Sequence, residues 1–209
     1  MSGYEEKAAY IGKLRNTVDL WRYYTIGRYN YIKCMESEFV GNLKSLWKRF
    51  QRYLTHYREK DNYLCLAIID IDYFKNYNDH YGHLRGDECL SLIGKALAAH
   101  WDNSSVFAAR IGGEEFALLW LEEDKHNAEY VVEQVHIRLR SLSIPHEKSC
   151  VLPYVTVSIG VSIAKCSVFD DTQVIYNFAD TALYKAKAKV RNCTVFFNED
   201  EEASTFPIK

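Results

Sequence analysis

The sequence has no excess of positive charge: 26 Lys and Arg residues stand against 28 Asp and Glu residues, which gives a net charge of −2 at pH 7. Proteins whose main task is to grip a nucleic acid backbone or an anionic membrane surface carry a basic surplus. We therefore expect neither a nucleic acid partner nor insertion into a membrane. An anionic ligand would have to be held by a few local cations, metal ions or backbone amides.

Long apolar runs are also missing. The longest, Tyr63 to Ile69, is far shorter than the ~20 residues that cross a bilayer. The N-terminal stretch MSGYEEKAAY lacks the basic region followed by an apolar region of a secretory signal. The six cysteines never occur as C-x-x-C, which indicates reduced thiols and argues against a disulfide framework or a zinc site. Together these absences predict a cytoplasmic protein.

Linker-like segments are scarce, since the 209 residues include only three prolines and ten glycines. We nevertheless expect two parts, a helical segment over residues 1–61 and a main domain over residues 62–209. Apolar residues recur at three- and four-residue steps from Phe39 to Tyr57, which predicts an amphipathic helix. That helix would pack either on its own domain or on a partner chain, so the N-terminal segment is a candidate dimerisation or lid element.

Strand and helix patterns alternate after residue 62. They predict a strand at 64–69, a helix at 88–100, strands at 106–111 and 115–121, a helix at 128–142, a strand at 154–163, a helix at 172–189 and a strand at 194–197. This order matches the split β-α-β arrangement of ferredoxin-like α+β folds, with an antiparallel central sheet and flanking helices. Because that fold hosts many unrelated functions, the function has to be argued from a site.

Two carboxylates, Asp70 and Asp72, come directly after the first predicted strand. Mg²⁺ takes one or two carboxylates together with substrate phosphates, and amides in the loop after a strand can point at a phosphate. The alternative is that both residues merely end the strand and cap the next segment of the chain.

The predicted hairpin turns through Gly112-Gly113 and continues with Glu114. Two glycines allow positive φ in a tight two-residue turn and let a ligand approach the backbone. Glu114 would then lie near Asp70 on the adjacent strand, or it would be an ordinary solvated glutamate.

Asn78, His83 and Asp87 lie in a polar stretch before the helix predicted at 88–100. A carboxylate can accept both donors on the edge of guanine, whereas adenine would leave it facing a lone pair. Asp87 is thus either a guanine ligand or the N-cap of the helix. Lys187 and Arg191 are four residues apart at the end of the last helix, where they would clamp a polyphosphate or simply be solvated.

In combination these features resemble the GGDEF family of diguanylate cyclases over roughly residues 62–197. The blocks that match are IIDIDYFKNYNDHYGHLRGDECL, RIGGEEFALLW, VTVSIGV and ADTALYKAKAKVRN, in the order of the family. The resemblance implies a nucleotidyl-cyclase-like fold and an enzyme that condenses two GTP molecules into cyclic di-GMP and two pyrophosphates. It also implies a homodimer, since each protomer presents one GTP and each 3′-hydroxyl attacks the α-phosphate of the opposite GTP.

The resemblance further assigns roles to individual residues. Asp70, Glu114 and the carbonyl of Ile71 would bind two Mg²⁺ or Mn²⁺ ions, and Glu114 is also the family's candidate base. Lys75 would stabilise charge in the transition state. The remaining residues implied in substrate binding are the backbone amides of Tyr73 and Phe74, the guanine ligands Asn78 and Asp87, the pocket residue His83, and the phosphate ligands Lys187 and Arg191.

The sequence departs from the family in two places. The stretch from Asp19 to Asn30 matches the usual opening D-x-L-T-G-L-x-N-R poorly, and Val190 replaces a glycine before Arg191. If that position needs positive φ, Arg191 would be displaced. These departures keep open a regulator that binds GTP or a cyclic dinucleotide without catalysis. A relaxed cyclase that makes mixed GMP–AMP dinucleotides is disfavoured by Asp87.

Overall fold

The computed structural model describes residues 40–99 and 106–198, all of which lie in the compact unit formed by residues 37–209. In chain order the elements are β1 (Gly41–Asn42), α3 (Leu43–Tyr57), β2 (Tyr63–Ile71), α4 (Phe74–Tyr81), α5 (His83–Ala98), β3 (Phe107–Arg110), β4 (Glu115–Glu122), the 3₁₀ turn η2 (Lys125–Asn127), α6 (Ala128–Ser141), β5 (Val157–Lys165), α7 (Thr172–Lys189) and β6 (Thr194–Phe196). No helix within the described ranges is long and apolar enough to span a membrane.

The strands form one six-stranded sheet in the order β1-β3-β4-β2-β5-β6. The four central strands are antiparallel, while the edge strands β1 and β6 pair in parallel with their neighbours. This arrangement confirms the predicted ferredoxin-like α+β fold. In the register of the sheet, Asp70 lies opposite Glu115 on β4 and opposite Ser158 on β5. The end of β2 therefore lies directly beside the turn between β3 and β4.

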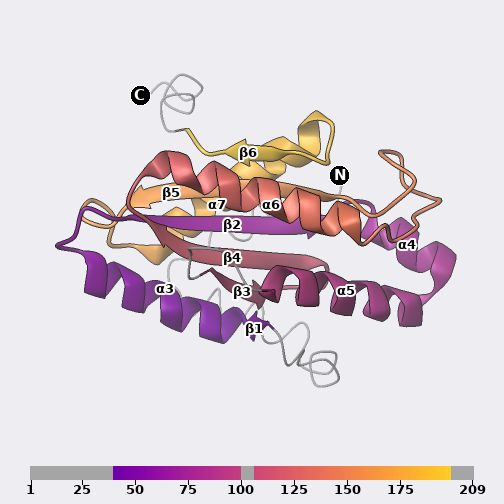
Figure 1. Cartoon of the computed structure of the whole chain (residues 1–209), viewed down its shortest axis with the longest axis horizontal. Helices are drawn as coiled ribbons and strands as arrows, with labels where there is room; N and C mark the ends of the chain where they lie inside the picture. The colour runs from indigo at the N-terminus through magenta and orange to yellow at the C-terminus, as the bar shows by residue number, and fades with distance from the viewer. Residues whose placement is uncertain (1–39, 100–105, 199–209) are drawn as a thin grey trace, which may run out of the picture. The chain divides into compact units, whose positions relative to one another are not determined.

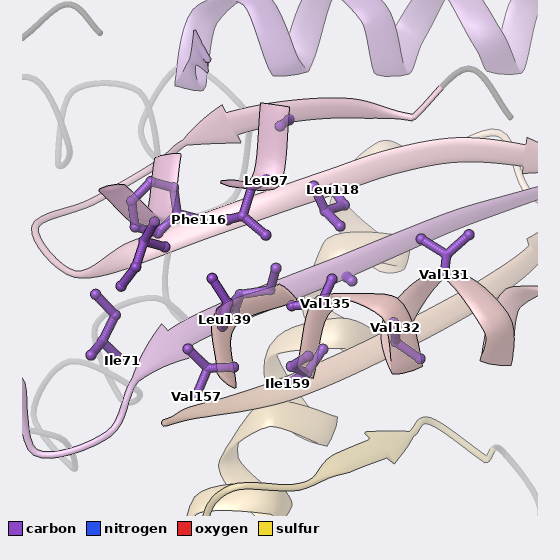
Figure 2. Packing of buried hydrophobic residues seen from close by; sticks show 14 of the residues in the cluster. Ile71, Leu97, Phe116, Leu118, Val131, Val132, Val135, Leu139, Val157 and Ile159 are labelled. Atoms are coloured by element: carbon purple, nitrogen blue, oxygen red, sulfur yellow. The ribbon is translucent and has the colours of Figure 1, made fainter. Parts of the chain in front are cut away.

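The two faces of β2 are both buried, because helices cover both sides of the sheet. The main apolar cluster joins the odd-numbered residues of β2 to apolar residues of α5 and α6. Figure 1 shows α6 crossing in front of the sheet, and Figure 2 shows Val135 and Leu139 of α6 beside Val157 and Ile159 of β5. Side chains alternate between faces along a strand, so Asp70 lies on the opposite face.

That opposite face is covered by α7, which packs very close to β5. A Cβ atom at Gly160 would collide with backbone atoms of Leu183 and Ala179 on α7. Glycine is thus required at this crossing, and the close approach brings the end of α7 to the end of β2.

Helix α3 begins with reciprocal capping, in which the Asn42 side chain accepts a hydrogen bond from the Ser45 amide at 3.0 Å. Leu46 and Phe50 are fully buried, and the ring of Trp47 lies 5.5 Å from that of Tyr176 on α7. The helix therefore packs on its own domain, and Trp47 and Phe50 are not exposed to a partner chain. The division at residue 62 and a role of residues 1–61 in dimerisation stay predictions.

Candidate functional site

Asp70 is a buried carboxylate at the end of β2, and it is paired with a cation from α7. The Lys187 ammonium nitrogen lies 2.7 Å from Asp70 Oδ2. Burial raises the pKa of Asp70 to about 7, Lys187 opposes that rise, and the nearby carboxylates of Glu115 and Glu114 add to it. At this end of the sheet Asp70 is thus paired with one ammonium group and is within electrostatic reach of two further carboxylates.

Asp72 has a different role from Asp70. It is 1% exposed and accepts hydrogen bonds from the hydroxyl groups of Thr156 at 2.7 Å and Ser158 at 2.6 Å. The amide of Asn192 donates a third at 3.0 Å. Because both oxygens are occupied, Asp72 fixes the end of β2 to β5 and to the turn after α7. These contacts favour the alternative interpretation for Asp72, in which it ends the strand and holds the next segment of the chain.

The β3–β4 turn brings the backbone of Glu114 beside β2, since the Ile71 amide donates to the Glu114 carbonyl at 3.3 Å. Arg110, the first residue of the block RIGGEEFALLW, stabilises this turn by donating to the carbonyls of Gly112 at 3.2 Å and Gly113 at 2.7 Å.

The turn is longer than the tight two-residue turn predicted from the sequence, because Arg110 pairs with Phe116 across it. Positive φ is not what its glycines provide, since Gly82 is the only glycine with positive φ among the described residues. A Cβ atom at Gly112 would collide with the Glu115 carboxylate, so a larger residue there would shift that side chain.

The donor set fits a hard divalent cation. Carboxylates of Asp70 and Glu114 and the carbonyl of Ile71 are oxygen ligands of the kind that Mg²⁺ takes, with substrate phosphates completing its shell. Within the described ranges no three His, Cys, Asp or Glu side chains are grouped as a metal site. A cation here would complete its ligand shell with substrate phosphates, and it would compete with Lys187 for Asp70.

An anion site is available where β2 passes into α4, a helix that the sequence analysis did not predict. Tyr73 has the left-handed conformation φ 54°, ψ 31°, and no side chain caps the helix. The first amides of a helix have no partner within it, so the Tyr73 and Phe74 amides are suitable phosphate donors. The Lys75 side chain is exposed.

Asn78 on α4 faces Gly86 on α5. Its Oδ1 atom is buried without a hydrogen-bond partner, and a Cβ atom at Gly86 would collide with that oxygen. Such an acceptor matches a donor on a ligand, as expected for a guanine site.

The interpretation of Asp87 as an N-cap is wrong, since α5 begins at His83 after Gly82, whose φ is 83°. Asp87 lies in the second turn and is half-buried, while His83 is exposed.

Arg191 lies in the turn after α7 and not on the helix itself, because α7 ends at Lys189. Helical spacing from Lys187 therefore does not place it. Arg191 and Asn192 have φ values of 54° and 45°, whereas Val190 has φ −128°. The position that lacks the family's glycine therefore needs no positive φ. The Arg191 guanidinium lies 4.6 Å from the centre of the Tyr73 ring, and its Nη1 donates to the Tyr73 hydroxyl at 3.3 Å.

The structure thus brings Asp70, Glu114, Tyr73, Lys187 and Arg191 together at one end of the sheet. The poorly matching stretch at residues 19–30 lies outside the described residues. Four residues that support the site were given no role from the sequence: Arg110, His146, Thr156 and Ser158. The blocks RIGGEEFALLW and VTVSIGV contain all of them except His146, so those blocks were the signal that could have found them. A hollow of about 420 Å³ between α6 and β6, lined by Glu133, His136, Arg140 and Cys193 among others, contains none of the predicted site residues.

Comparison with protein families agrees with this arrangement. The model of the family described as "Diguanylate cyclase, GGDEF domain" matches residues 40–193. Among curated proteins, diguanylate cyclase A of Treponema denticola is 37% identical over 134 residues, which are 64% of this chain and 35% of that protein. The probable diguanylate cyclase DgcT of Escherichia coli is 33% identical over 63% of this chain and 28% of its own length. The chain thus spans about a third of the length of these relatives.

Solved structures show the same fold. The GGDEF domain of DgcB from Caulobacter crescentus in complex with c-di-GMP is 28% identical with a TM-score of 0.65, over 75% of this chain and 91% of that one. The active GGEEF domain of a diguanylate cyclase from Vibrio cholerae is also 28% identical with a TM-score of 0.65, over 78% of this chain and 99% of that one.

Proposed function

The chain belongs to the GGDEF diguanylate cyclase family, and on that premise we propose that it condenses two GTP molecules into cyclic di-GMP with release of two pyrophosphates. One observation carries the proposal: carboxylates from β2 and the β3–β4 turn meet cationic side chains from the end of α7 at one end of the sheet. Carboxylates suit the metal ions that accompany a triphosphate, and cations suit the triphosphate itself.

In this proposal Asp70, Glu114 and the Ile71 carbonyl would hold two Mg²⁺ or Mn²⁺ ions. Bound metal ions would neutralise phosphate charge and lower the pKa of the attacking 3′-hydroxyl. Glu114 and Lys75 are the residues proposed to act in catalysis.

The protein's own groups would orient GTP. The free amides of Tyr73 and Phe74 would donate to its outer phosphates, and Lys187 and Arg191 would bind the same phosphates by charge-assisted hydrogen bonds. The orphaned Oδ1 of Asn78 is an acceptor for a guanine donor, with Asp87 accepting from guanine and His83 completing the pocket.

We propose a homodimer, because one site holds one GTP and the reaction joins two. Each protomer would present its nucleotide so that the 3′-hydroxyl of one faces the α-phosphate of the other. A cytoplasmic location stays a prediction, since a relative from Staphylococcus epidermidis that is 29% identical over 86% of this chain is named an uncharacterized membrane protein.

A second function is favoured by the ion pair between Lys187 and Asp70, which joins a phosphate ligand to a metal ligand. If the pair persists when nucleotide binds, the chain would bind GTP or a cyclic dinucleotide without catalysis. The normal conformation of Val190 favours the cyclase.

The deciding experiment incubates the purified full chain with GTP and Mg²⁺ and identifies the products by mass spectrometry. We expect cyclic di-GMP and pyrophosphate, at a specific activity that rises with protein concentration as dimers form. Binding of GTP without product would show the regulator instead. ATP should give no cyclic product, because adenine cannot donate to Asp87 as guanine does.

A further inference from the structure

Tyr73 contacts both parts of the proposed phosphate site, which are the amides at the start of α4 and the Arg191 guanidinium. Its backbone begins α4, and its carbonyl accepts from the Tyr77 amide at 3.1 Å. The Nε2–H group of His146 donates to the same carbonyl at 3.2 Å. His146 is 1% exposed, so this contact comes from a rigid and buried partner. The left-handed conformation of Tyr73 is costly for a residue with a Cβ atom, and these hydrogen bonds hold it.

The turn that carries Arg191 is fixed in a similar way. Arg191 and Asn192 are both left-handed. The Arg191 amide donates to the Ala186 carbonyl at 3.3 Å, and the Asn192 amide donates to Asp72 at 3.0 Å. The backbone at the base of the Arg191 side chain is therefore anchored to the same buried carboxylate that fixes the end of β2.

The side chain of Arg191 is long, and an anchored backbone does not determine where its guanidinium lies. Ordering such a side chain costs conformational entropy. Tyr73 restrains it at two points: the ring lies under the guanidinium at 4.6 Å and the hydroxyl accepts from Nη1 at 3.3 Å. A stacked planar cation with one nitrogen bound keeps its other N–H groups available for an anion.

We propose that the side chain of Tyr73 is a positioning residue, which holds the Arg191 guanidinium beside the amides of Tyr73 and Phe74 so that both donate to the phosphates of one nucleotide. The inference rests on the proposed function for the identity of the nucleotide. It goes beyond that function because it assigns a role to the Tyr73 side chain, whereas the family resemblance implicates its backbone amide.

The test measures equilibrium affinity for a GTP analogue with a methylene group between its α- and β-phosphates, which cannot be cleaved there, in the presence of Mg²⁺. Tyr73→Phe keeps the ring and loses the hydrogen bond, and we expect the analogue to bind about 3-fold more weakly. Tyr73→Leu loses both contacts, and we expect about a 10- to 30-fold loss. Guanosine, which has no phosphate, should bind all three proteins equally.

Arg191→Ala supplies the decisive background. If Tyr73 acts through Arg191, adding Tyr73→Leu to Arg191→Ala should weaken analogue binding less than about 2-fold, because the partner is already gone. An unchanged 10-fold loss in that background, or an equal loss for guanosine, would show that Tyr73 only supports the fold and would overturn the proposal.

Thermal unfolding of each variant checks that it folds. If Tyr73→Leu is unfolded, the test instead compares the effect of Tyr73→Phe on analogue binding in the wild-type chain and in the Arg191→Lys variant. Lysine keeps the charge and lacks the planar donor group. Tyr73→Phe should then weaken binding in the wild-type background and have no effect beside Arg191→Lys; a 3-fold loss in both would overturn the proposal. A wild-type chain that binds the analogue and yields no cyclic di-GMP would refute the proposed function while leaving this cycle interpretable.

Discussion

The Lys187 ammonium group and the Asp70 carboxylate are 2.7 Å apart, and the two side chains are only 13% and 8% exposed. The two form an ion pair, although the family resemblance assigns Lys187 to phosphates and Asp70 to a metal ion. A buried ion that loses its partner is left without compensation from water. Without ligands, therefore, Lys187 provides the positive charge that Asp70 needs.

The first prediction concerns the removal of this pair. Lys187→Met should lower the free energy of unfolding of the ligand-free chain by about 3 kcal/mol at pH 8, because the buried Asp70 carboxyl must then either stay ionised without a counter-charge or take up a proton. Adding Mn²⁺ should restore part of the loss, since the ion takes the place of the ammonium group. Both effects are measured by chemical denaturation.

The matched control is the double variant Asp70→Asn with Lys187→Met, which has no buried charge to compensate. It should be more stable than Lys187→Met alone and should not respond to Mn²⁺. Additive losses in the double variant would contradict the coupling between the two side chains.

The second prediction tests Glu114. Glu114→Gln should reduce cyclic di-GMP synthesis by at least about 100-fold, because residues that merely support a metal ligand already account for 10- to 100-fold effects. The fold should persist, since the hydrogen bond to Ile71 uses the backbone carbonyl. Glu123→Gln removes the same charge from an exposed position beyond the other end of β4 and should leave the rate unchanged. A near-normal rate for Glu114→Gln would refute the assignment.

The third prediction concerns the small residue beside the orphaned oxygen of Asn78. Gly86→Ala places a methyl group where it collides with Asn78 Oδ1, so the Asn78 side chain must move. We expect guanosine to bind about 10-fold more weakly, which corresponds to the one to two kcal/mol that a base contact contributes. Calorimetry with guanosine measures this effect. In an Asn78→Ala background the same substitution should cost nothing further; an equal loss there would mean that Gly86 serves another purpose.

Periodicity predicted the regular elements well, because each has one strongly apolar face. Helix α7 matches the predicted range 172–189, and the buried strand at 64–69 is the centre of β2. Helix α4 was missed because it is only eight residues long, its apolar positions are three aromatic residues in a polar sequence, and its start depends on a left-handed Tyr73. Helix α5 begins at His83, before the expected residue 88, because Gly82 with φ 83° starts it within the polar stretch.

The candidate site was predictable in its members and unpredictable in its contacts. Asp70, Glu114, Lys187 and Arg191 could be named from the motif, but their spacing did not show that Lys187 pairs with Asp70 or that Arg191 stacks on Tyr73. Those contacts depend on how closely α7 packs at Gly160. His146 carries no pattern of its own, since its role comes from a loop that folds back on Tyr73.

The last prediction uses that buried histidine. Burial lowers the pKa of His146 below its ordinary 6.5. Just below pH 6.5 the imidazole is therefore protonated in the unfolded chain and neutral in the folded chain. Stability from this group is therefore present above pH 6.5 and is lost as pH falls below it. His146→Gln keeps an N–H donor for the Tyr73 carbonyl and does not titrate. In denaturation of the ligand-free protein between pH 8 and pH 5, the variant should lose less stability than the wild type.

Among the described residues, His136 and Asp70 also have shifted pKa values that bear on this range. Burial also lowers the pKa of His136, which acts in the same direction, and it raises the pKa of Asp70 to about 7, which acts in the opposite one. Both are present in the wild type and in His146→Gln, so the difference between the two curves isolates His146. A further variant, His136→Gln with His146→Gln, should flatten the acid side still more. Parallel curves for the wild type and His146→Gln would mean that folding does not change proton binding by His146, and would contradict its lowered pKa.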